Sequence, residues 1–236
     1  MPGKPKSIDE YLARLLRGVA VLLLISCLAT RAGRAQSPSR DGTTEQSRRG
    51  AWQVGAFVGG ARNSRNDAVL GTIPHRDHFV VGLQAGTPVL RLGPVRVSYI
   101  AQLLPLFIVS DRDAPAYNSF LDASGMPRLP QRAYAFGVSP FGLEIASPAA
   151  RRVSVFASSA GGGLIFSHSF PDVTGRRTNF TLEAGGGLRV RVGSSHWAQL
   201  GYKYHHISNA GTAFANPGLD GNLLYAGYQW SVGLPQ

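Results

Sequence analysis

Three side chains near the C-terminus have the residue types of a serine hydrolase. His206 and Ser208 are two positions apart in the stretch YKYHHIS, and Asp220 follows after a segment rich in Gly, Asn and Pro. Residues two apart on a β-strand point to the same side with Cα atoms roughly 6.5 Å apart, so an imidazole can reach a hydroxyl. Serine is a poor nucleophile without such a base, and a carboxylate from a neighbouring strand would fix the histidine tautomer. The spacing therefore permits acyl transfer, although a bare His-x-Ser more often consists of polar residues at a strand end.

Other chemistries have weaker support. His205 adjoins His206, and His75, His78 and His168 could add metal ligands. Strand alternation sends the first two to opposite faces and the others lie in separate loops, so we expect no metal site. The chain has no G-x-S-x-G elbow and no P-loop, which argues against an ordinary α/β-hydrolase and a nucleotide enzyme. We expect no cofactor.

Alternation of apolar and polar residues dominates the chain after residue 50. The clearest segment is 178–192, where even positions such as Phe180, Leu182 and Val190 are apolar and odd positions such as Glu183 and Arg189 are polar. Similar alternation predicts eight strands, and no segment keeps a helical period of useful length. The predicted strands are Trp52 to Ala61, His78 to Leu90, Val95 to Ser110, Ala133 to Ala146, Val153 to Ser167, Thr178 to Val192, Trp197 to Ala210 and Asn222 to Leu234.

The length and number of these strands predict a membrane barrel. Strands of ten or more alternating residues are longer than those of soluble sheets and suit a tilted crossing of the bilayer. An even number can close without an exposed edge, as hydrocarbon requires. Short links alternate with longer ones, as do periplasmic turns and external loops. The fold class is therefore all-β, an eight-stranded antiparallel transmembrane β-barrel over residues 51–236.

The same alternation assigns sides to the candidate residues. Tyr202, Tyr204, His206 and Ser208 share the apolar face of the seventh strand, which should face lipid at the membrane rim. Asp220 has the matching parity on the eighth strand if the turn inserts no bulge.

Two glycine runs, Ala160 to Leu164 and Ala184 to Leu188, are symmetric about Thr174. A hairpin turning there would place them side by side, where they would relieve crowding at a tightly bent wall; a groove for a lipid chain is the alternative.

The N-terminus resembles an export signal. Basic residues precede the apolar run 18–28, which is too short to span a bilayer, and Ala35 ends a small-x-small cleavage site. We predict a cleaved signal peptide over residues 1–35 and a flexible polar leader over 36–50. Cys27, the only cysteine, lies inside the signal, and lipidation there is the alternative to cleavage at Ala35.

The charge of the remaining chain points to anionic partners. Residues 1–35 contain six of the 24 basic and two of the 13 acidic residues, so their removal leaves a formal charge of +7. An exported chain rarely meets nucleic acid, so we expect outer-membrane lipids as partners, with loop arginines such as Arg62, Arg65, Arg176 and Arg177 near their phosphates. The sequence leaves open whether the chain forms a homodimer.

The motif around the candidate triad resembles a known family. His206-Ile207-Ser208-Asn209-Ala210-Gly211, followed by Asn216-Pro217-Gly218-Leu219-Asp220, is similar to the C-terminal motif of the PagL-type outer-membrane lipid A 3-O-deacylases. The resemblance covers roughly residues 200–230. It implies an eight-stranded barrel of the bacterial outer membrane with Ser208 as nucleophile, His206 as base and Asp220 as third member. It also implies that Asn216 and Gly211 form the oxyanion hole, with Asn209 beside them.

Two departures from the family pattern stand out: Asp220 replaces a glutamate, and the chain lacks the terminal aromatic residue of many outer-membrane barrels. The expected function is hydrolysis of an ester-linked acyl chain of lipid A in lipopolysaccharide. The alternatives are a non-catalytic barrel, structural or adhesive, and a narrow pore lined by Glu183, Arg189, Arg191 and Lys203, although these side chains would fill so small a lumen by pairing.

Overall fold

The computed structural model describes residues 52–62, 69–73, 75–113, 122–125, 131–148, 152–171, 175–213 and 216–232. All of them belong to one compact unit, Arg48–Gln236. The predicted signal peptide, the predicted leader, Cys27 and Arg65 lie outside the described residues.

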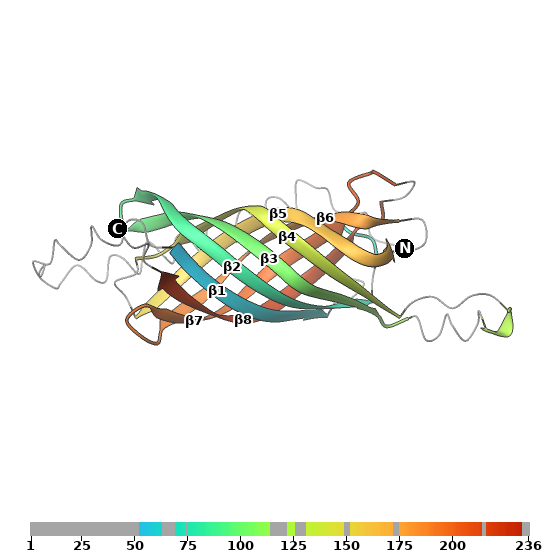
Figure 1. Cartoon of the computed structure of the whole chain (residues 1–236), viewed down its shortest axis with the longest axis horizontal. Coiled ribbons are helices and arrows are strands. Elements are labelled where there is room, and N and C mark those ends of the chain that lie inside the picture. The colour runs from blue at the N-terminus through green and yellow to red at the C-terminus, as the bar shows by residue number, and fades with distance from the viewer. Residues whose placement is uncertain are drawn as a thin grey trace, which may run out of the picture. The chain divides into compact units, whose positions relative to one another are not determined.

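Eight strands form a closed barrel in chain order (Figure 1). Each strand pairs antiparallel with its neighbour in sequence, and β1 closes the ring against β8. Their bounds are β1 Trp52–Arg62, β2 Arg76–Leu92, β3 Val95–Asp111, β4 Arg132–Ala146, β5 Val153–Phe170, β6 Arg176–Arg191, β7 His196–Ser208 and β8 Leu219–Val232. The predicted fold class is confirmed, and every strand end lies within three residues of its predicted position. Among the described residues, no helix has the length and apolarity needed to cross a membrane.

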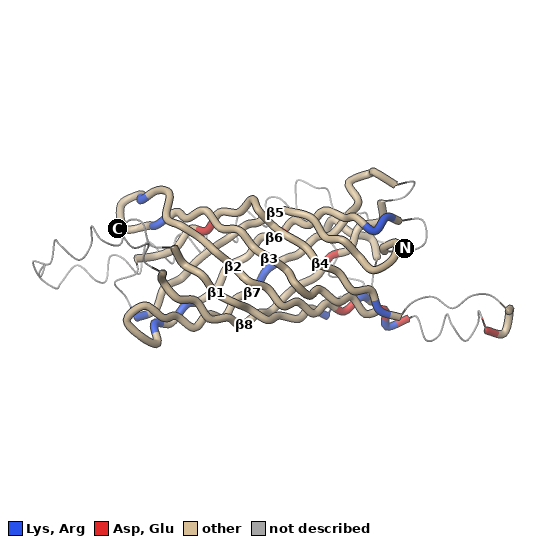
Figure 2. The backbone as a smooth tube through the Cα atoms, viewed as in Figure 1, with Lys and Arg blue, Asp and Glu red and all other residues tan. Residues whose placement is uncertain are grey.

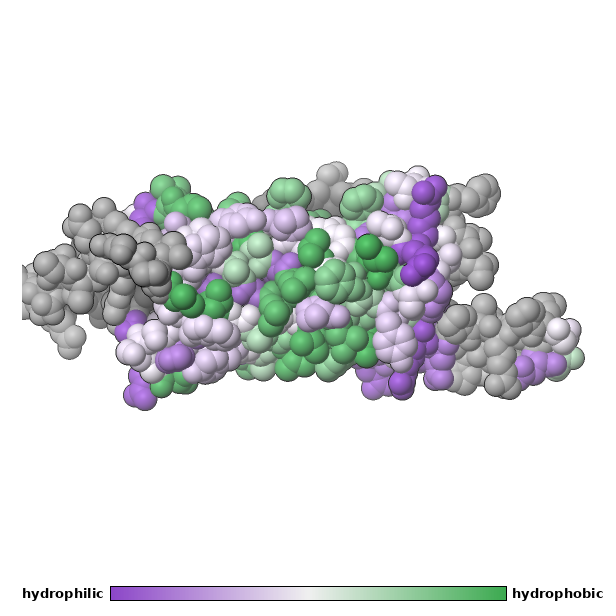
Figure 3. Space-filling model, in the orientation of Figure 1, coloured by the Kyte–Doolittle hydropathy of each residue, from purple (hydrophilic) through white to green (hydrophobic). Residues whose placement is uncertain are grey.

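The outer wall is apolar along its middle. Leu200 and Leu224 are each 64% exposed, and Phe141 is 77% exposed. Figure 3 shows hydrophobic residues over the middle of the visible face and hydrophilic ones at its right-hand end, and Figure 2 places most charged residues near the barrel ends. So large an exposed apolar surface is expected where lipid is the solvent.

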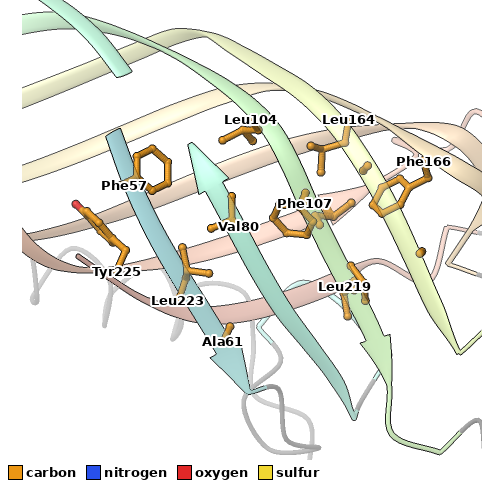
Figure 4. Close-up of a cluster of buried hydrophobic side chains, with 14 of the residues drawn as sticks. Phe57, Ala61, Val80, Leu104, Phe107, Leu164, Phe166, Leu219, Leu223 and Tyr225 are labelled. Carbon is orange, nitrogen blue, oxygen red and sulfur yellow. The ribbon is translucent and has the colours of Figure 1, made fainter. Parts of the chain in front are cut away.

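The interior is filled rather than hollow. An apolar cluster that includes Phe57, Phe107 and Leu164 lies inside the strands (Figure 4). The predicted pairing of interior charges is confirmed for two cations: Lys203 Nζ lies 2.9 Å from Glu183 Oε2, and the Arg189 guanidinium donates to both carboxylate oxygens of Glu144 at 3.1 and 2.8 Å. The apolar cluster was not predicted from the sequence.

The strands at the C-terminal side of the barrel pair without interruption. β7 keeps one register along its whole contact with β6 and with β8. Several other pairs shift register, including β5 with β6 between Ile165 and Phe170. The prediction that the two glycine runs lie side by side is wrong: Ala160 pairs with Glu183 and Gly161 with Leu182, partly because of that shift and partly because the pairing of β5 with β6 is not centred on Thr174.

Crowding at the wall explains four of these glycines, Gly162 and Gly185 to Gly187, whereas a Cβ on Gly161 or Gly163 would make only an ordinary contact at 3.6 Å. A Cβ on Gly162 would clash with the Val138 carbonyl oxygen, and one on Gly185 would clash with the Tyr202 carbonyl oxygen. The backbones approach too closely there for any side chain.

Candidate active site

The even-numbered residues Tyr202 to Ser208 of β7 form an outward-facing row, which we call the outward row. Tyr202 is exposed and Tyr204, His206 and Ser208 are half-buried, whereas the odd-numbered residues between them are buried in the barrel. The sidedness predicted for this strand is therefore confirmed.

Ser208 is the last residue of β7, at the end of the barrel where the long connections 63–75, 112–131 and 209–218 lie. The fourth connection at this end is shorter than predicted, because β5 and β6 extend to Phe170 and Arg176.

His206 and Asp220 face each other from the adjacent strands β7 and β8. They are direct register partners of β7 and β8, because β8 begins at Leu219, three residues earlier than predicted, and no bulge intervenes. The Nδ1 of His206 lies 2.6 Å from Oδ1 of Asp220. An ionised carboxylate only accepts hydrogen bonds, so Nδ1 carries the proton and Nε2 is left as the acceptor. This is the tautomer that a general base needs.

The second oxygen of Asp220 is bound by the β1–β2 connection. The backbone N–H groups of Val69, Leu70 and Gly71 donate to Oδ2 at 2.6, 2.8 and 2.8 Å. The Tyr204 hydroxyl also hydrogen-bonds to the Asp220 carboxylate. The Asp220 side chain is thereby only 2% exposed although it has outward parity, whereas the His206 side chain keeps 15%. A substrate can touch the imidazole but not the carboxylate.

Ser208 lies on the same face as His206, but among the described residues the His206 ring is hydrogen-bonded to Asp220 and not to Ser208. The residue of β6 that pairs with Ser208 is Phe180, which is 51% exposed. The hydroxyl is therefore flanked by an apolar, lipid-facing side chain on one side and by the imidazole on the other. Such loose nucleophile–base geometry is common without substrate.

The turn after Ser208 is built by Asn209. Its side-chain oxygen accepts the Gly211 N–H at 2.9 Å, and its own N–H donates to Oδ1 of Asn216 at 3.0 Å. Ala210 and Gly211 both have positive φ, 51° and 74°, so the chain turns sharply at the end of β7. The Gly211 N–H predicted for the oxyanion hole is thus held by Asn209, and Asn216 is exposed beside the same turn.

An open groove of about 580 Å³ lies beside Phe180 at this end of the barrel. Phe180, the strand partner of Ser208, forms one wall, and Thr212 from the β7–β8 connection forms another. Arg176 and Arg177 add positive charge, and the Nε of Arg177 donates to the Phe166 carbonyl at 2.9 Å. The complete lining is Ser169, Gly175, Arg176, Arg177, Thr178, Phe180 and Thr212.

The four other histidines considered as metal ligands do not join the site. His205 points into the barrel, where its ring packs against Phe107 and hydrogen-bonds to Thr181. His78 lies beside it, with ring centroids 6.4 Å apart. His75 pairs with Asp113 at the rim and His168 with Ser167. Within the described ranges, no three His, Cys, Asp or Glu side chains are grouped closely enough to hold a metal ion.

Two parts of the site were not predicted from the sequence. Tyr204 shares the outward row with His206, so strand parity could have suggested it. The Val69–Gly71 segment gave no signal, because it reaches Asp220 across about 150 residues of sequence.

Known proteins resemble this chain in sequence and in fold. Residues 113–229 match the sequence model of a family described as lipid A 3-O-deacylase (PagL). No curated protein sequence matches the chain significantly.

Among solved structures, the outer-membrane enzyme PagL superimposes with a TM-score of 0.51 at 16% identity, over 74% of this chain and 97% of that one. Neisserial surface protein A superimposes with a TM-score of 0.46 at 14% identity, over 76% of this chain and 96% of the other. The PagL superposition shows a shared fold, and the family match covers β4 to β7 and most of β8 with the site residues. The part of the chain that carries the site, residues 113–229, therefore belongs to the PagL family, described as lipid A 3-O-deacylase.

Proposed function

We propose that this protein is a serine esterase that hydrolyses the 3-O-linked fatty acyl ester of lipid A in lipopolysaccharide. The observation that carries the proposal is the 2.6 Å contact between His206 and Asp220, in the outward row that also holds Ser208. The three side chains supply a nucleophile, a base and an orienting carboxylate. They lie on the lipid-facing wall, where a substrate with its tails in the bilayer can approach from the side.

The reaction follows from the tautomer of His206. Its Nε2 accepts the Ser208 proton as the Ser208 oxygen attacks the ester carbonyl, and Asp220 stabilises the imidazolium that forms. Collapse of the tetrahedral intermediate breaks the bond to the sugar oxygen, which takes the proton from His206. Water then attacks the acyl-enzyme with His206 as base, and releases the fatty acid and the free Ser208 hydroxyl.

The turn at residues 209–216 is the proposed oxyanion site. Because Oδ1 of Asn216 accepts the Asn209 N–H, the amide NH₂ of Asn216 is the group left to donate to the oxyanion. The Gly211 N–H, which donates to the Asn209 side-chain oxygen in this structure, would be the second donor to the oxyanion. In this scheme Asn209 holds the turn in shape and lies next to the bound substrate.

The groove beside Phe180 is the proposed seat of the phosphorylated sugar. Its volume is in the usual range of small-molecule sites, and Arg176 and Arg177 offer charge-assisted hydrogen bonds to phosphate. The acyl chains would lie along the neighbouring outward side chains Leu182 and Tyr202.

Replacing Ser208 with Ala tests the proposal against a non-catalytic barrel, structural or adhesive. Purified wild-type and Ser208→Ala proteins would be incubated with lipopolysaccharide, and lipid A would be analysed by mass spectrometry. We expect the loss of one 3-O acyl group with the wild type and none with the variant. Equal release by both proteins would reject Ser208 as nucleophile, and no release by either would favour the non-catalytic barrel.

A further inference from the structure

Residues 69–73 of the β1–β2 connection lie against Asp220 of the candidate triad. Three consecutive N–H groups, from Val69 to Gly71, converge on one carboxylate oxygen of Asp220 at 2.6 to 2.8 Å. Consecutive backbone donors that converge in this way form an anion-binding nest. We call residues 69–71 the carboxylate clamp.

The clamp is itself fixed to the β7–β8 connection. The Thr72 N–H and hydroxyl both donate to the Pro217 carbonyl, at 2.7 and 2.5 Å. Gly71 and Gly218 meet backbone to backbone: a Cβ on Gly71 would lie 2.9 Å from the Gly218 carbonyl carbon and oxygen. Gly218 in turn borders His206, since its own Cβ would lie 3.0 Å from Cε1 of the ring. The clamp, Asp220 and His206 are therefore packed as one unit.

We propose that the carboxylate clamp is the positioning element of the catalytic carboxylate, which adds a role for the β1–β2 connection to the proposed function on which it rests. By binding Oδ2, the clamp directs Oδ1 to His206 and sets the imidazole for Ser208. It also stabilises an anion on a wall that otherwise faces lipid, where an unpaired charge is costly.

Leu70→Pro tests the clamp because proline lacks the N–H that binds Asp220. Leu70→Ala removes the same side chain and keeps that N–H. We expect kcat of Leu70→Pro to be about ten to a hundred times below that of Leu70→Ala with similar KM, because misplaced catalytic groups cost rates of this order. Rates are divided by the folded fraction, measured from the mobility of the unheated barrel in SDS gels.

Gly71→Ala gives a second test that keeps every N–H. Its Cβ would push the clamp away from Gly218, whereas Gly60→Ala in β1 meets only an ordinary contact at 3.5 Å and serves as the matched control. We expect kcat to fall with Gly71→Ala and to stay near wild type with Gly60→Ala.

Combination with Asp220→Asn separates positioning from folding. If the clamp acts through the carboxylate, adding Leu70→Pro to Asp220→Asn should change kcat by less than about threefold, because residues that act as a unit are non-additive. The clamp proposal is overturned if Leu70→Pro matches Leu70→Ala, or if its full penalty persists in the Asp220→Asn background. Activity in Ser208→Ala would instead overturn the proposed function itself.

Discussion

Asp220 divides its two oxygens between two tasks. One receives the Nδ1 proton of His206, and the other receives three backbone N–H groups. An asparagine at this position would keep its oxygen on the backbone donors and turn its NH₂ group towards Nδ1. Nδ1 would then have to accept, and the proton would move to Nε2, the atom that must take the Ser208 proton.

Asp220→Asn should therefore lower kcat by about 10³- to 10⁴-fold while the barrel stays folded, as tautomer reversal does in serine proteases. The measurement is single-turnover release of fatty acid from lipopolysaccharide. A loss of less than tenfold would mean that the carboxylate does not set the His206 tautomer.

Arg176 is the residue at which the seat of the sugar phosphate can be tested. Arg176→Gln should raise KM for phosphorylated lipid A about tenfold with little change in kcat, because a phosphate contact made equally in ground and transition states is uniform binding. Arg152→Gln, which is exposed in the turn before β5 at the other end of the barrel, is the control. A dephosphorylated substrate should remove the difference, and an effect that survives dephosphorylation would argue against a phosphate contact.

At the scale of the elements, β6, β7 and β8 form a continuous part of the wall that holds both the site and the interior ion pair of Lys203 with Glu183. Lys203, one strand position from Tyr204, pairs with Glu183 and lies 4.3 Å from the ring centroid of Phe57. Lys203→Met would leave the Glu183 carboxylate buried without its cation and should cost about 3–5 kcal/mol of unfolding free energy. Adding Glu183→Gln should recover most of that loss, which urea titration in lipid vesicles can measure; no recovery would mean that Lys203 contributes through packing alone.

The sequence predicts these elements well because period-two alternation is a local property. Strand positions and the outward side of His206 and Ser208 follow from it directly. Register is not local: the shift between Ile165 and Phe170 adds to the offset of the glycine runs, and the sequence carries no sign of that shift. The same holds for the clamp on Asp220 and for the Asn209 side chain that holds the Gly211 N–H, because both depend on where connections fold back.

At the scale of the whole molecule, the lipid-facing belt sets a cost for charge that depends on depth. Leu200, 64% exposed near the middle of the wall, should tolerate arginine poorly: Leu200→Arg is expected to cost about 2–4 kcal/mol of stability in bilayers. Leu92, 60% exposed at the end of β2, is the control and should cost about 0–1 kcal/mol as arginine. Urea titration of both variants in vesicles gives the comparison, and equal costs would place the bilayer elsewhere on the barrel.

The outward seat of His206 and Ser208 also determines how the substrate is found. We expect a lipid to reach them by lateral diffusion within one leaflet. The encounter rate then depends on the mole fraction of the lipid in the membrane and not on its bulk concentration. Diluting the substrate with an inert detergent at constant bulk concentration should slow turnover in proportion. We therefore expect little hydrolysis of the same ester in a freely dissolved, water-soluble molecule.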